Sequence, residues 1–223
     1  MSVVNIAVMP DRILILTDTL TYRGETPVSL RVRKGAISET GGFVTTARGS
    51  RWICDLFMHV NDGATDLDGA LALWRGELPK IDPFLHGKDG SELFMVGFSH
   101  MLGGLAAVSL KSEFPEGKPV VTERDFGPGI HLAPEFPGRV EAMLPKVADE
   151  HVMQRIALAQ WKVQRKTGMK LCIGGCMWLF EVTPNGATER IVGTYPDYAT
   201  HAAAFGDPNA GVVASLFPQE KVA

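Results

Sequence analysis

The sequence predicts an α+β fold arranged as a four-layer αββα sandwich, with two sheets stacked in the middle and helices on the outside. Two observations carry this prediction. Runs of predicted strands alternate with runs of predicted helices, which is typical of α+β layering. The first two strands, residues 3–9 and 13–18, are apolar on successive residues, and this pattern indicates strands that are buried on both faces.

The first 50 residues are predicted to be mainly β structure. Residues 3–9 and 13–18 should pair as a hairpin, because a Pro-Asp-Arg turn separates them. Residues 28–34 and 35–38 form a weaker predicted strand pair, and residues 43–47 form the next strand.

Two helices are predicted to follow these strands. The first begins at the N-cap Ser50 and has the apolar stripe Ile53, Leu56, Phe57 and Val60. The second ends at Pro79 and has the apolar stripe Leu67, Leu71, Trp74 and Leu78.

The β pattern returns in the second half of the chain. Strands are predicted at 93–98 and 105–110, a loop with short strand pieces at 111–135, and a short helix at 139–144. A longer helix at 149–166 carries the apolar stripe Val152, Ile156, Ala159 and Val163. A strand at 171–182, interrupted by Gly174-Gly175, turns at 184–186 into a strand at 188–194. We expect one domain over residues 1–223, with an irregular C-terminal tail over 195–223.

Composition excludes several classes of protein. The 223 residues carry a formal net charge of −3, so we expect no broad nucleic-acid-binding surface. The sequence has no run of about 20 apolar residues, so we expect no membrane span. The N-terminus lacks a basic region followed by an apolar core and a small-residue cleavage site, so we expect no secretory signal. Three cysteines, an odd number, do not make a disulfide framework. These features favour a cytoplasmic protein with no nucleic-acid or membrane partner.

Four pieces of the chain have an order and spacing that match one known family. Asp18 follows Ser2 by sixteen residues, and Lys34 follows Ser2 by thirty-two. Residues 45–50 run from a strand into Gly-Ser before a helix, and residues 174–186 run from Gly-Gly through a strand into a Thr-x-x-Gly turn. Together these pieces resemble the N-terminal-nucleophile hydrolases, and within them the proteasome β-subunit branch.

The resemblance covers roughly residues 2–60 and 150–190, and it implies a catalytic arrangement. Ser2 would be the nucleophile, because a free N-terminal α-amine can act as the base for the hydroxyl of its own residue. Lys34 would favour the ionised nucleophile, Asp18 would balance and orient Lys34, and Gly49 would supply an oxyanion-stabilising N–H. The implied substrate is a peptide or small amide, with no cofactor and no metal.

Several residues depart from the family pattern. Aligned on the Gly-Gly pair, Lys170 and Ile173 stand where active members carry an Asp and a Ser. The family's Gly-Ser-Gly would fall near residues 127–129, which are Gly-Pro-Gly and hold no hydroxyl. Neither Lys170 nor Ile173 can accept the hydrogen bonds of the nucleophile's ammonium group.

Two further features bear on whether the site is complete. The spacing from Lys34 to Gly49 is fifteen residues, one more than in the family, so either Lys34 is misaligned or the loop at 39–42 holds an insertion. Met1 precedes Ser2 and must be removed for the α-amine to be in place.

Other chemistry-bearing residues give weaker patterns. Cys172 and Cys176 have the spacing C-x₃-C with no second close pair, so we interpret them as buried thiols rather than zinc ligands. The six histidines show no ligand spacing, and Ser99-His100 is only a weak candidate for nucleophilic catalysis because no G-x-S-x-G motif accompanies it.

Two functions therefore remain open at the level of the sequence. One is an amide-bond hydrolase that works through Ser2, divergent and with weak or no activity. The other is a non-catalytic scaffold or binding subunit that keeps the sandwich and lacks the chemistry. In both cases we expect a homo-oligomer, because Trp52, Phe57 and Trp74 give the helix pair at 50–79 more aromatic surface than a monomer needs.

Overall fold

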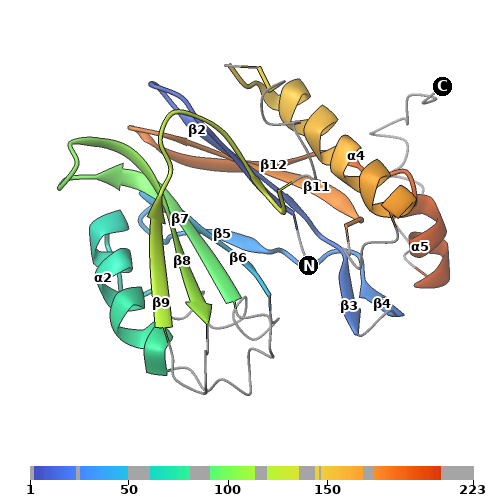
Figure 1. Cartoon of the computed structure of the whole chain (residues 1–223), viewed down its shortest axis with the longest axis horizontal. Coiled ribbons are helices and arrows are strands. Elements are labelled where there is room, and N and C mark those ends of the chain that lie inside the picture. The colour runs from blue at the N-terminus through green and yellow to red at the C-terminus, as the bar shows by residue number, and fades with distance from the viewer. Residues whose placement is uncertain are drawn as a thin grey trace.

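The computed structural model describes residues 3–23, 26–49, 61–80, 91–113, 120–135, 144–145, 147–167 and 173–206. The predictions for Ser2, for the helix after Ser50, for the helix at 139–143 and for Lys170 lie outside these ranges. Within them the fold is α+β, with strands that pair antiparallel throughout (Figure 1).

Two five-stranded sheets form the body of the protein (Figure 1). The first has the strand order β10-β1-β2-β11-β12, made of Gly129–Ala133, Val4–Val8, Ile13–Asp18, Cys176–Thr183 and Gly186–Thr194. The second has the order β5-β6-β7-β8-β9, made of Gly35–Ile37, Phe43–Arg48, Ser91–Ser99, Gly104–Glu113 and Val120–Asp125. A separate ribbon pairs β3, Thr21–Arg23, with β4, Thr26–Ser29.

The helices lie on either side of the sheets. Helix α2, Leu67–Glu77, continues as a 3₁₀ turn, Leu78–Lys80, and packs on the second sheet. Helix α4, Glu150–Thr167, packs on the first sheet, and a short helix α5, Tyr198–Ala204, follows β12. No helix in these described ranges is long and apolar enough to cross a membrane.

Strand β2 shows why the first hairpin is apolar on successive residues. Its side chains alternate between two faces. Ile13 and Ile15 enter a core cluster that also contains Val44 and Phe94 of the second sheet, so this cluster lies between the two sheets. Leu14 and Leu16 enter a different cluster, shared with helix α4. The prediction that this hairpin is buried on both faces is confirmed.

Helix α4 is present, and its predicted inward stripe is correct in part. Ile156 is buried and Val152 packs against the core, but Ala159 is exposed. The buried face also carries Met153, Ala157, Gln160 and Gln164. The Gln160 amide exchanges hydrogen bonds with the Asn5 amide of β1, at 2.7 and 3.0 Å. Buried polar side chains such as these amides are hydrogen-bonded. The positions that they occupy are therefore not apolar, and an apolar pattern in the sequence does not identify them as buried.

Three other expectations need correction. Residues 28–34 do not form one strand, because β4 ends at Ser29 and residues 30–34 are irregular. The tail is not wholly irregular, since α5 occupies part of it, with Tyr198 and Ala202 buried. Trp74 of α2 is fully buried between this helix and the second sheet, so it adds no aromatic surface for self-assembly.

The turn between β7 and β8 is fixed by one carboxylate in the first turn of α2. Asp68 accepts hydrogen bonds from the Ser99 hydroxyl at 2.7 Å and from the backbone N–H groups of His100 and Met101 at 2.8 and 3.2 Å. Partial burial raises the pKa of Asp68, but these hydrogen bonds outweigh it and hold the pKa below its ordinary value. Ser99 therefore supports a turn rather than acting as a nucleophile.

We predict that Asp68→Ala lowers the free energy of unfolding at pH 7 by about 1–2 kcal/mol, because it leaves donors at this turn without their acceptor. Since the folded-state pKa is lowered, the contribution is present above the ordinary Asp pKa and is lost as pH falls through the folded-state pKa. Urea unfolding at several pH values measures this, with the exposed Asp62→Ala as control. Equal effects of the two substitutions would contradict the prediction.

Candidate functional site

A buried ion pair joins the end of β2 to the residue just before β5. The Lys34 ammonium lies 2.7 Å from Oδ2 of Asp18 and also donates to the Leu20 carbonyl oxygen at 2.7 Å. The second oxygen of the Asp18 carboxylate accepts the backbone N–H of Val3 at 2.9 Å. One carboxylate thus holds both the predicted lysine and the residue that directly follows Ser2.

The surroundings of this pair exclude water almost completely. The side chain of Asp18 is 0% exposed and that of Lys34 is 3% exposed. Burial raises the pKa of Asp18, while the charge and hydrogen bond of Lys34, and then the N–H of Val3, act against that rise. Removing one partner of such a pair leaves an uncompensated buried charge, which typically costs about 3–5 kcal/mol.

Gly49 lies at the end of β6, the strand that pairs with β5 directly after Lys34. It follows β6 directly, is exposed and has φ +112°, a conformation that glycine adopts without strain. The N–H of Ala47, two residues earlier, donates to the carbonyl oxygen of Lys34 at 3.2 Å. The structure therefore brings Asp18 and Lys34 into contact and places the end of β6, which Gly49 follows, beside Lys34, although these residues are well separated in sequence.

The Gly-Gly pair packs against the segment that follows Asp18. The Gly174 carbonyl oxygen accepts the N–H groups of Thr19 and Leu20 at 3.3 and 3.1 Å. The Thr19 hydroxyl donates to the Leu30 carbonyl oxygen at 2.5 Å and accepts the N–H of Cys176 at 2.7 Å. This hydroxyl leaves no room for a side chain on Gly175, where a Cβ would lie 2.4 Å from Thr19 Oγ1.

The residues that depart from the family pattern also have definite places. Ile173 is fully buried in the cluster under α4, and its N–H donates to Gln164 Oε1 at 2.9 Å. The Gly-Pro-Gly segment is not near the start of β1, because Gly129 pairs with Val8 at the far end of that strand. The segment beside the start of β1 is instead the one after Ala133, which pairs with Val4, and it carries Glu135.

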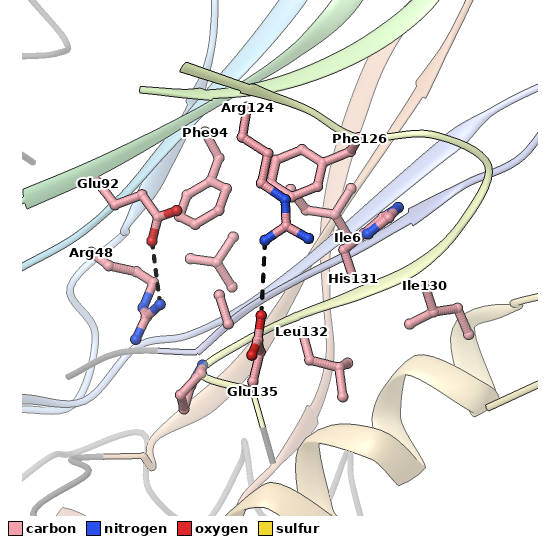
Figure 2. Close-up of a pocket in the computed structure, with 13 residues that line it drawn as sticks. Ile6, Arg48, Glu92, Phe94, Arg124, Phe126, Ile130, His131, Leu132 and Glu135 are labelled. Atoms are coloured by element: carbon pink, nitrogen blue, oxygen red, sulfur yellow. Dashed lines mark hydrogen bonds and ion pairs between the residues drawn. The ribbon is translucent and has the colours of Figure 1, made fainter. Parts of the chain in front are cut away.

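A pocket of about 470 Å³ opens between the two sheets near the start of β1 (Figure 2). Its lining includes Val4 of β1, Arg48 directly before Gly49, and Glu135. The pocket was not evident from the sequence, because its walls come from five strands that are distant in the chain. Strands β9 and β10 flank the opening because each is the edge strand of its sheet. Which strands lie at the edges depends on how all the strands of each sheet pair.

The remaining sequence candidates do not form a second site. Cys176 is buried, and Cys172 lies outside the described residues. Among the residues with defined positions, no group of three or more His, Cys, Asp or Glu side chains could hold a metal ion.

Comparison with protein-family models found no match, and comparison with curated proteins found no significantly similar relative.

We predict that Gly175→Ala destabilises the protein more than Gly41→Ala. Both glycines have positive φ, +80° and +72°, so both substitutions incur the backbone strain of about 1–2 kcal/mol. Only the added Cβ at Gly175 meets other atoms, since nothing lies within 4 Å of a Cβ at Gly41. Chemical denaturation measures the difference, and equal losses of stability for both variants would show that the contact with Thr19 has no effect.

Proposed function

We propose that the chain is an N-terminal-nucleophile amide-bond hydrolase of the proteasome β-subunit type, divergent and weakly active, with Ser2 as nucleophile after removal of Met1. One observation carries the proposal. The Asp18 carboxylate binds the N–H of Val3 and the ammonium of Lys34 at the same time. This arrangement ties Lys34 to the chain one residue away from Ser2.

The arrangement of the layers supports the proposal. Apolar clusters lie between the two sheets, between the second sheet and α2, and between the first sheet and α4. Together they are consistent with a four-layer αββα sandwich, the architecture that the resemblance implies. The pairing of Lys34 with Asp18 also favours the hypothesis that the extra residue before Gly49 lies in the loop at 39–42, rather than the hypothesis that Lys34 is misaligned.

In the proposed reaction, the neutral α-amine of Ser2 takes the proton of the Ser2 hydroxyl as Oγ attacks the amide carbonyl carbon. Lys34 stabilises the negative charge on Oγ, and Gly49 donates its N–H to the oxyanion. The C–N bond then breaks, and the leaving amine takes the proton from the α-ammonium. Water attacks the resulting ester, which releases the acid and restores Ser2. Asp18 is a positioning residue that holds Lys34.

The departures from the family pattern are the reason for expecting weak activity. Ile173 offers a hydrocarbon side chain, and its N–H is already bonded to Gln164. The Gly-Pro-Gly segment brings no hydroxyl to the start of β1. Each missing hydrogen bond to the amine would cost about 1–3 kcal/mol, and a loss of about 3 kcal/mol in the transition state lowers the rate about a hundredfold.

A second candidate function is a non-catalytic scaffold or binding subunit that assembles with itself. The burial of Ile173 favours it, because this position carries a hydroxyl in active members. In that case the Asp18–Lys34 pair has a structural role only.

The experiment that separates these functions is intact-mass measurement of the protein before and after treatment with a β-lactone, an acylating electrophile. We predict a mass that lacks Met1 and a single adduct that fragmentation assigns to Ser2. The adduct should be absent from Ser2→Ala and retained in Ser99→Ala, because Ser99 is bound in the β7–β8 turn. Quantitative retention of Met1, or an adduct on Ser2→Ala, would contradict the hydrolase proposal.

A further inference from the structure

The pocket between the sheets has a floor of core side chains and a charged rim. Val4 and Ile6 of β1 and Phe94 of β7 line it, and all three belong to the core cluster between the sheets. Arg124 on β9 and Glu135 after β10 lie on opposite sides of the opening (Figure 2). A site of this kind binds the apolar part of a ligand by burial and orients the ligand through the few charged groups.

Arg124 is held in place but is weakly paired. Its guanidinium stacks over the Phe126 ring at 5.0 Å, which fixes the direction of the side chain. Its ion pair with Glu135 spans 3.8 Å, too long for a hydrogen bond. By contrast, Arg75 donates two hydrogen bonds to Glu123 at 2.7 and 2.5 Å. The guanidinium group of Arg124 therefore makes no hydrogen bond with its ion-pair partner, Glu135.

Glu135 is a poor permanent partner for Arg124. Its side chain is 66% exposed, so water solvates the Glu135 carboxylate whether or not it is paired with Arg124. An exposed pair at this distance contributes little to stability. The carboxylate of an incoming ligand could form two parallel hydrogen bonds with the guanidinium and would displace Glu135 at little cost.

A second arginine of the pocket lining is more buried than Arg124. Arg48 has a side chain only 14% exposed and faces Glu92 at 3.4 Å (Figure 2). Burial lowers the pKa of Arg48, and the charges of Glu92 and Asp18 oppose that effect, so the group stays cationic at neutral pH. Arg48 directly precedes Gly49 in the chain. The pocket therefore lies next to the residue that we propose as the oxyanion donor.

From this geometry we propose that the pocket binds the free carboxylate of the substrate, and that the substrates are small amides bearing a carboxylate, such as N-acyl amino acids or the C-terminal ends of short peptides. Arg124 binds the carboxylate, and Phe126 and Ala133, the lining members of the core cluster that keep some exposed surface, contact the apolar part. This inference rests on the proposed function for its link to Ser2, but the binding itself does not require catalysis.

The test is calorimetric titration of the Ser2→Ala protein with hippurate, an aromatic N-acyl amino acid, so that binding is measured without turnover. We expect hippurate to bind at least tenfold more tightly than hippuramide, its neutral analogue. Arg124→Gln should weaken hippurate binding about tenfold or more. Glu135→Gln should strengthen it severalfold, because the competing carboxylate is gone. Arg190→Gln, which changes an exposed arginine paired on the outer face of the first sheet, is the matched control and should have no effect.

Several outcomes would overturn the inference. These are no binding of hippurate at millimolar concentration, equal affinity for hippuramide, tighter binding of a cationic analogue such as N-benzoylethylenediamine, or weaker binding in Glu135→Gln. Hippurate binding to a protein whose Ser2 is unreactive would support the pocket and reject the hydrolase. A reactive Ser2 with no hippurate binding would support the hydrolase and reject the pocket.

Discussion

The burial of the Asp18–Lys34 pair is the constraint on which the rest of the site depends. Two opposite charges with almost no exposure are tolerated only when each is fully satisfied, because desolvation costs several kcal/mol per ion. The partners that satisfy them are the N–H of Val3 and the carbonyl oxygen of Leu20. These contacts fix the start of β1, the end of β2 and the approach to β5 relative to one another. A simple ion pair on the surface would fix none of them.

The same constraint places the proposed chemistry beside the pocket. Val3 points toward the cluster under α4 while Val4 and Ile6 point between the sheets, so alternation along β1 separates a structural face from a face that lines the pocket. The proposed mechanism requires the Ser2 side chain to share the face of Val4. Gly49 and Arg48 approach the same end from β6, which connects a candidate oxyanion donor with a charged residue of the pocket.

The parts of the fold that depend on local pattern were predictable from the sequence. The doubly apolar hairpin, the spacing of Asp18 and Lys34, and the helix with Trp74 all follow from periodicity or from the family resemblance. The glutamine part of the buried face of α4 could not be found in this way, because Gln160 and Gln164 are buried through hydrogen bonds to other segments of the chain. Neither could the position of Glu135 beside the start of β1, which depends on the register between β1 and β10 rather than on any motif.

The most direct test of the account is the second-order rate of Ser2 acylation by the β-lactone in Lys34→Met, compared with the unmodified sequence and with Lys80→Met. Lys80 is the matched control because its side chain is 68% exposed and pairs with Glu77 on the surface. Each variant must first show a cooperative unfolding transition, which confirms that it is folded. The account predicts at least a tenfold loss of acylation rate in Lys34→Met and no change in Lys80→Met. Equal rates in all three proteins would contradict the claim that the buried pair serves the nucleophile.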